Sequence, residues 1–434
     1  MYTELGEELL DLEIERAALA RGLISTSVSR VRAEEDGVLA ASADPEALWW
    51  RSASLPASGA GSERRRQWAF SLVENDRLAQ LRGSCAHAWY EELHPVSEPE
   101  AGELSPRAVV HRILDDPHRR HVWARSFEAI CSHAADVCIR WQEGRAELAA
   151  LLRVDLGELE SREAYQGVTH RWLALSEELY GGLGLEFPSW LDCALGSSCG
   201  DGWPGHLNWR TVQEVLGADS WLGASRPSFP AAPRALGAAS WQRAFAIFGQ
   251  CWADAQLTRA RPFLLWRHPA RLAEKARGGL LALLPLNGEF ARRRQGLSRE
   301  SALRQRRVLA RSILCWTRWL SLRCLLEGGI GLGRPAFRSH FREAAAEALN
   351  FPLPGEFAGA LPRLRPGAGP SLLGLLAAAR TQARLVQSFD EDWFWNPRCC
   401  ELLRDTFPQE NAEEEPVSTL DLAPLYDLLE SSLS

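Results

Sequence analysis

Apolar residues recur at intervals of three and four along most of the chain, a pattern typical of amphipathic helices. The clearest apolar stripe follows Pro117 and consists of Trp123, Phe127, Ile130, Ala134, Val137 and Trp141. Similar patterns predict helices over 3–21, 64–93, 162–180, 238–256, 270–284, 298–327, 336–349, 371–388, 397–406 and 420–433. Alternating patterns typical of strands are nearly absent. The pattern therefore predicts an all-α fold.

Local signals predict where several helices begin. Asp116-Pro117 and Asn396-Pro397 each combine a capping side chain with a proline in the first turn. Ser418 and Asp421 resemble a capping box that opens the final helix.

Stretches rich in Gly, Pro, Ser or Glu interrupt the helical pattern. We expect surface loops or linkers over 51–62 and 94–106. Longer irregular stretches run over 181–206, 223–237 and 350–370. Loops of this length inside a compact protein often carry function.

Composition places the chain among ordinary globular proteins. It has 434 residues, of which 46% are hydrophobic, 24% charged and 9% aromatic. These values exclude a disordered or fibrous chain. No apolar run approaches the ~20 residues that a membrane span needs. The N-terminal region is acidic rather than signal-like, so we expect a cytoplasmic protein.

The cysteines and tryptophans suggest packing rather than chemistry. No pair of the ten cysteines has the C-x-x-C spacing, which argues against zinc ribbons and thioredoxin-like sites. We expect reduced thiols, with one buried and one exposed thiol in the adjacent pair Cys399 and Cys400. Most of the 18 tryptophans are expected in the core.

Basic charge is concentrated in one region of an acidic chain. Residues 254–323 contain sixteen basic and four acidic residues, whereas the whole chain carries a net charge of −7. The arginines of helix 298–327 favour a solvated or salt-bridged face, and anion or nucleic-acid binding by Arg304, Arg307 and Arg311 is the alternative. The candidate ligand-binding side chains of this helix and of region 240–255 are Trp316, Arg318, Trp319, Arg323, Gln250 and Trp252.

Known catalytic motifs are incomplete. The glycines of 328–333 (GGIGLG) follow a predicted helix rather than a strand, so they predict a helix end and not a nucleotide loop. Ser198 matches G-x-S-x-G but lacks the strand–turn–helix context of a nucleophile elbow. Cys251 lies in an apolar helical run and is interpreted as structural.

Metal-binding motifs are incomplete too. None of the ten histidines is followed by Glu, so H-E-x-x-H is absent. His94, His118 and His121 form the one alternative metal set, and it lies among arginines that disfavour a cation. The sequence therefore predicts no catalytic residue, no metal and no cofactor.

The C-terminal third resembles a known family. Residues 374–385 (GLLAAARTQARL), 389–398 (FDEDWFWNPR) and 401–404 (ELLR) are similar to the end of zinc metallopeptidases related to thimet oligopeptidase and oligoendopeptidase F. In that family a helix leads to Asp-Trp, then Asn-Pro-Arg and a short closing helix. The long helical region 115–155 and the order of helices 302–327 and 336–349 follow the same layout.

This resemblance implies a large bilobed, all-α clamshell with an internal cavity for short peptides. We expect an N-terminal lobe over 1–160 and a C-terminal lobe over 161–434. The counterpart of the family's zinc helix is 240–255 (SWQRAFAIFGQCWADA), which has neither His nor Glu. No functional residue carries over, so the resemblance predicts the fold and argues against the activity.

The leading hypothesis is a non-catalytic, metallopeptidase-like protein that binds a peptide or partner protein in its cavity. An active peptidase or another enzyme with a non-standard site is the first alternative. An anion or nucleic-acid binder that uses helix 298–327 is the second. The sequence leaves the oligomeric state open.

Overall fold

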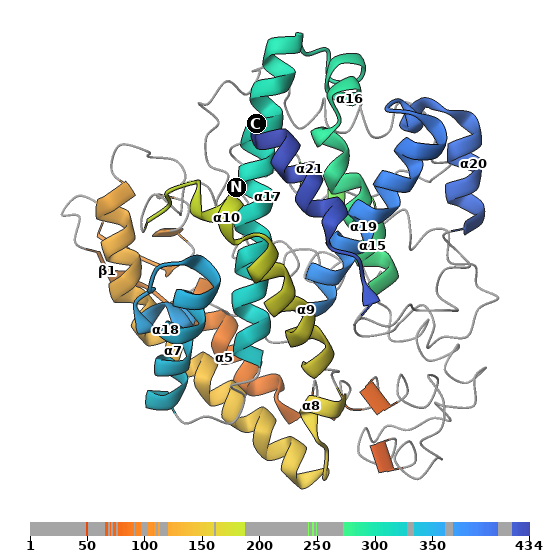
Figure 1. Ribbon diagram of the computed structural model, residues 1–434. Coiled ribbons are helices and arrows are strands. Elements are labelled where there is room, and N and C mark those ends of the chain that lie inside the picture. Colours follow the sequence, from red (N-terminus) through yellow and green to blue (C-terminus); the bar gives the residue numbers. More distant parts are fainter. Residues whose placement is uncertain are drawn as a thin grey trace, which may run out of the picture.

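The computed structural model of the protein is mostly helical in the part of the chain that it describes (Figure 1). Continuous described segments are 77–90, 92–96, 102–106, 120–159, 162–186, 272–327, 334–360, 368–406 and 419–434. Single positions or pairs are also described at 49–50, between 66 and 74, at 108, 109 and 112, and between 242 and 249. The predicted helix over 3–21 and most of the predicted helix over 238–256 lie outside the described residues.

Helix α17 (Arg299–Glu327) is the central element of this assembly (Figure 1). It packs against α9 (Arg162–Leu175), α18 (Arg334–Leu349), α19 (Ala368–Phe389) and α21 (Ala423–Leu433). The first turns of α17 keep an exposed polar face, whereas nearly every side chain from Ser312 to Leu326 is buried. Its second half is therefore surrounded by other helices, and the one-sided pattern expected of a surface helix is lost there.

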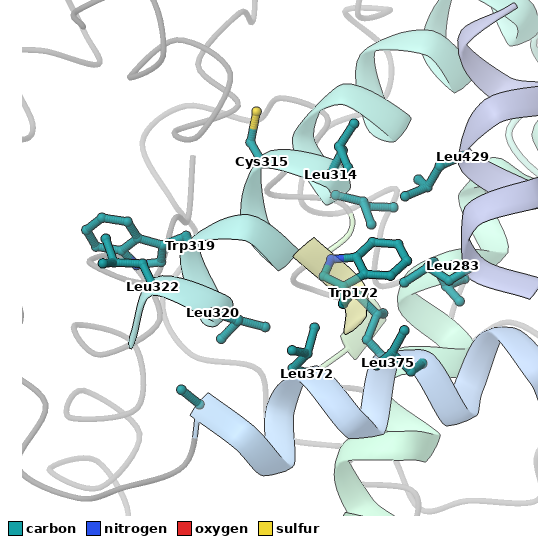
Figure 2. Close-up of a cluster of buried hydrophobic side chains, with 14 of the residues drawn as sticks. Trp172, Leu283, Leu314, Cys315, Trp319, Leu320, Leu322, Leu372, Leu375 and Leu429 are labelled. Carbon is teal, nitrogen blue, oxygen red and sulfur yellow. The ribbon is translucent and has the colours of Figure 1, made fainter. Parts of the chain in front are cut away.

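The core is built from five helices that meet around Trp172 (Figure 2). Trp172 of α9 is fully buried, with Leu283 of α15 (Leu272–Leu283), Leu314 of α17, Leu375 of α19 and Leu429 of α21 in the same cluster. Trp319 lies on the other side of α17 from Trp172 (Figure 2). Because a tryptophan removes a large apolar area from water, its burial supports the expected role of these residues in packing.

Helices α15 (Leu272–Leu283) and α19 approach each other very closely. A Cβ atom added at Gly374 would lie 2.6 Å from Lys275 Cβ and 2.7 Å from Lys275 C. A Cβ atom added at Gly279 would lie 2.9 Å from Ala378 Cβ. Both glycines are therefore required by the contact between the two helices rather than by a turn.

The predicted long helix after Pro117 is confirmed as α7 (Arg120–Leu151). It packs along α5 (Ala79–Tyr90), α18 and the 3-10 helix η4 (Gly355–Ala360). The rings of Phe127 and Phe357 are in contact at a tilt of 37°, with their centroids 5.5 Å apart. The proposed lobe boundary at residue 160 stays a prediction.

Short elements complete the described fold. They are β1 (His94–Pro95), β2 (Glu103–Leu104), α8 (Leu156–Leu159), α10 (Glu177–Gly181), η3 (Leu284–Leu286), α16 (Gly288–Arg293), η5 (Trp393–Trp395) and α20 (Pro397–Thr406). β1 and β2 pair antiparallel, His94 with Leu104 and Pro95 with Glu103. The expectation of only a loop over 94–106 was wrong in this detail, because residues 94–95 pair with residues 103–104. A ladder of two residue pairs is too short to show the alternating apolar and polar pattern of a strand.

The predicted helix starts have different outcomes. Asn396 Oδ1 accepts a hydrogen bond from the Arg398 N–H at 3.0 Å, which confirms the cap of α20. Asp116 and Pro117 lie outside the described residues. Ser418 lies outside the described residues, so its part in the capping box stays a prediction; α21 begins at Ala423, and Asp421 Oδ1 accepts a hydrogen bond from the Ala423 N–H at 3.1 Å.

The all-α class is confirmed for the described residues, apart from the short ladder. These residues do not show two lobes around a central channel. In the same part of the chain, no helix is both long and apolar enough to cross a membrane.

Candidate functional site

A pocket of about 810 Å³ lies among α16, α17, α19 and α21. Its volume is within the range of small-molecule and peptide sites. The polar part of its lining consists of Asn287, Glu289, Arg292, Arg299, Arg306, Gln382, Glu391, Asp427 and Ser431. The apolar part consists of Leu286, Ala302, Leu303, Ala379, Ala383, Val386, Pro424 and Leu428.

Asn287 fixes one wall of this pocket. Its Oδ1 accepts a hydrogen bond from the Phe290 N–H at 3.0 Å and so caps α16. Its Nδ2 donates to the carbonyl oxygen of Glu391 at 2.7 Å. One buried side chain thus ties the start of α16 to the segment that follows α19.

Ion pairs hold the same wall from the solvent side. Glu289 binds Arg292 and Arg293 at 2.9 Å each, and Arg293 also binds Asp392 at 3.1 Å. These pairs are about half exposed, so each adds little to stability. Their effect is to fix the positions of charged side chains at the edge of the pocket.

Arginines of α17 attach α21, which forms the opposite wall. Arg306 Nε donates to Ser432 Oγ at 3.0 Å, and Arg306 Nη2 donates to Ser431 Oγ at 3.1 Å. Arg307 Nη2 donates to the Ser434 carbonyl oxygen at 2.7 Å. These two arginines therefore have internal hydrogen-bond partners on α21, whereas the sequence predicted a solvated or salt-bridged face.

Two charges of opposite sign remain at the pocket. Arg299 on the first turn of α17 and Asp427 on α21 are exposed, and neither has an ion pair or a hydrogen bond with the described residues. Both are free to interact with a ligand.

Arg318 is fully buried, and its guanidinium is used internally. Nε donates to the Ala348 carbonyl at 2.6 Å, and Nη1 donates to the Leu173 carbonyl at 2.8 Å and to Ser176 Oγ at 3.2 Å. Nη2 donates to Glu177 Oε2 and Asn350 Oδ1, each at 2.9 Å. The expectation that Arg318 is available to a ligand is corrected: it satisfies carbonyls at the ends of α9 and α18.

The other candidate residues on α17 do not form an exposed surface either. Trp319 and Arg323 are each 4% exposed, so the stacking of a base or peptide on Trp319 is not available in this structure. Trp316 is partly buried and packs against the core. Gln250 and Trp252 lie outside the described residues.

The histidine set does not come together as a described site. His94 is buried in β1, His121 is exposed at the start of α7, and His118 lies outside the described residues. Among the described residues, no group of three or more His, Cys, Asp or Glu side chains could hold a metal ion. The donor set of 240–255 does not fit the zinc site of the resembled family, because it offers no imidazole and no glutamate.

Five cysteines whose side chains the structure describes are free and buried: Cys131, Cys315, Cys324, Cys399 and Cys400. Burial raises the pKa of the Cys324 thiol to about 12, and Glu327 adds to this effect. Burial also raises the pKa of Cys399 to about 12, helped by the neighbouring Cys400. Both members of this pair are buried, so the expectation of one exposed thiol was wrong.

Sequence reasoning missed the pocket residue Gln382. It lies on the buried stripe of α19 with Ala378, Ala379 and Leu385. A polar residue at an apolar position of a helix was a signal that could have identified it. Ser198, Cys251 and the 328–333 glycines lie outside the described residues, although α17 ends at Glu327, directly before the glycines.

No protein-family model matches the chain, and no curated protein matches it. The residues that carry the resemblance to the oligopeptidases have structural roles here. Asp392 pairs with Arg293, Trp393 is fully buried, and Asn396 caps α20. The family assignment stays a prediction.

Proposed function

We propose that this chain is a non-catalytic helical protein that binds a peptide, or a segment of a partner protein, in the pocket among α16, α17, α19 and α21. The observation that carries the proposal is the pocket itself, whose volume is about 810 Å³ and whose lining is both apolar and polar. Such a lining suits a peptide, which presents apolar side chains together with a polar main chain.

The metallopeptidase-like clamshell is part of the same proposal. In that arrangement, 240–255 would line a central channel without holding zinc, because its side chains include no histidine and no glutamate. A cytoplasmic location is also part of the proposal, and the free state of the five buried cysteines named above supports it.

Peptide binding is tested with an array of acetylated, amidated nonapeptides. We expect array members to bind the wild type and to lose at least tenfold in affinity for Ala383→Trp, which places an indole in the pocket. Ala346→Trp is the control, because Ala346 is exposed on α18 and does not line the pocket. Equal binding by all three proteins would refute the pocket as the site.

The non-catalytic part of the proposal has a separate test. Stoichiometric zinc in the purified protein, together with cleavage of the array peptides that a chelator abolishes, would overturn it. Salt-dependent binding of a polyanion, lost when Arg304 and Arg311 are neutralised, would instead favour the alternative use of α17.

A further inference from the structure

Three arginines and three carboxylates line the pocket among α16, α17, α19 and α21, and most of them are bound within the protein. Arg292 pairs with Glu289 at 2.9 Å. Arg306 donates hydrogen bonds to two serines of α21. Glu391 accepts a hydrogen bond from the side-chain amide of Asn287 at 3.4 Å. These four charged side chains are therefore part of the walls of the pocket.

Arg299 and Asp427 are the two charged lining residues that have no such partner. Both side chains are exposed, and neither has an ion pair or a hydrogen bond with the described residues. Arg299 begins α17, whereas Asp427 lies on α21, so the two charges stand on different helices of the pocket. A ligand that pairs with them breaks no bond inside the protein. They are therefore the charges best placed to recognise a ligand.

The lining of the pocket has the same spacing on three helices. On α17 the lining residues are Arg299, Ala302, Leu303 and Arg306, and the lining residues of α19 and α21 repeat this spacing. Positions i, i+3, i+4 and i+7 share one face of a helix over two turns. The lining thus extends along about 10 Å of each helix axis. About three residues of an extended peptide cover that length.

Each free charge has an apolar neighbour in the lining. Leu303 lies one turn after Arg299 on the same face of α17 and is 52% exposed. Leu428 follows Asp427 on α21 and is partly exposed. An apolar side chain of a ligand can pack on these leucines and remove them from water. The pocket thus combines an apolar contact surface with one free charge of each sign.

The balance of charge argues against a polyanion as the ligand. The lining has equal numbers of arginines and carboxylates, and the two unpaired charges are also of opposite sign. An acidic segment that pairs with Arg299 would meet the repulsion of Asp427 in the same pocket. A balanced site does not attract a polyanion as a basic cleft does.

We propose that Arg299 and Asp427 select the ligand of this pocket by charge. The ligand is a short peptide segment in which an acidic and a basic side chain flank an apolar one. The acidic side chain pairs with Arg299, the basic side chain pairs with Asp427, and the apolar side chain packs on Leu303. This proposal rests on the proposed function of the pocket.

The test measures dissociation constants of acetylated, amidated nonapeptides, whose blocked termini leave the side chains as the only charges. The parent peptides have a central leucine between a glutamate and an arginine, in both orders and at one- or two-residue separations. In the analogues, glutamine replaces the glutamate or the arginine. The wild type is expected to bind the tightest parent about threefold to fivefold more tightly than either analogue, because a partly exposed ion pair adds modestly to affinity.

Two neutral variants assign each preference to one side chain. Arg299→Gln is expected to lose the preference for glutamate over glutamine in the peptide and to keep the preference for arginine. Asp427→Asn is expected to show the reverse. Both preferences are ratios measured on one protein, so a general loss of folded protein does not change them. Arg311→Gln and Glu401→Gln are the matched controls, exposed and outside the pocket, and should keep both preferences.

Charge reversal gives a further measurement. Arg299→Glu is expected to bind the parent peptide more weakly than an analogue in which arginine replaces the glutamate. Three results would each overturn the proposal. They are the absence of a charge preference in the wild type, a preference for glutamate that persists in Arg299→Gln, and tighter binding of a peptide with two acidic side chains.

The two proposals fail in different ways. Peptide binding that Ala383→Trp abolishes, but that shows no charge preference, refutes only the role of Arg299 and Asp427. No binding of any nonapeptide refutes both proposals.

Discussion

Replacing Arg318 with methionine tests whether this arginine is an internal connector. The change keeps an unbranched stem in place of the first part of the arginine side chain but removes the guanidinium and all five of its hydrogen bonds. It also removes the contact of the guanidinium carbon with the Tyr180 ring, whose centroid lies 4.6 Å away. The partners come from two chain segments, 173–180 and 348–350, so the ends of α9 and α18 and the start of α10 lose a shared donor at once.

The expected loss of stability comes mainly from the buried carbonyls of Leu173 and Ala348. Each buried group left without its donor costs about 1–3 kcal/mol. Glu177 is 55% exposed and can be rehydrated, so its lost pair adds little. The expected decrease in the free energy of unfolding is about 4 kcal/mol, in line with the ~3–5 kcal/mol for breaking a buried pair. Arg318→Lys should recover only part of the lost stability, because a compact ammonium group cannot bond all the acceptors that the planar, forked guanidinium reaches.

The assay is urea unfolding, monitored by far-ultraviolet circular dichroism. Wild type and variants are compared with the same slope of the free energy of unfolding against urea concentration. Arg311→Met is the matched control. Arg311 is exposed on the same helix, makes no ion pair or hydrogen bond with the described residues, and should change stability by no more than about 0.5 kcal/mol. A decrease below about 1 kcal/mol for Arg318→Met would refute the connector role.

Two further predictions concern packing and titration. Gly374→Ala should lower the free energy of unfolding by about 2 kcal/mol, because the new Cβ meets the backbone of Lys275. The control Gly167→Ala, on the exposed face of α9, should raise the free energy of unfolding by up to about 1 kcal/mol. Equal effects of the two variants in urea unfolding would contradict the close contact of α15 and α19. The buried thiols should make the protein less stable at alkaline pH. Because the pKa of Cys324 is raised from 9.0 to about 12, the unfolded state loses its proton first, and stability present below pH 9 is lost between about pH 9 and 12. Cys324→Ala should reduce the loss between pH 8 and 10 by about 1 kcal/mol, and an unchanged pH dependence would show that the thiol does not contribute.

Some features of this protein follow from short stretches of sequence. The limits of α20 agree with the expected helix over 397–406, because Asn396 and Pro397 define its start through contacts within a few residues. The long helix α7 and the central helix α17 were also expected from their apolar spacing. Helical periodicity depends on neighbours three and four residues apart, so the sequence shows it directly.

Other features depend on residues that are distant in the sequence. Arg318 looks like one of several solvated arginines on α17, yet its partner Leu173 is 145 residues away. Gln382 belongs to a pocket because α16, α17 and α21 converge beside α19. In the described part of the chain, the sequence by itself thus determined where the long helices lie, because helices form through contacts along one segment. The tertiary structure alone decided which polar side chains are buried, paired or left facing a pocket, because that depends on how separate helices pack together.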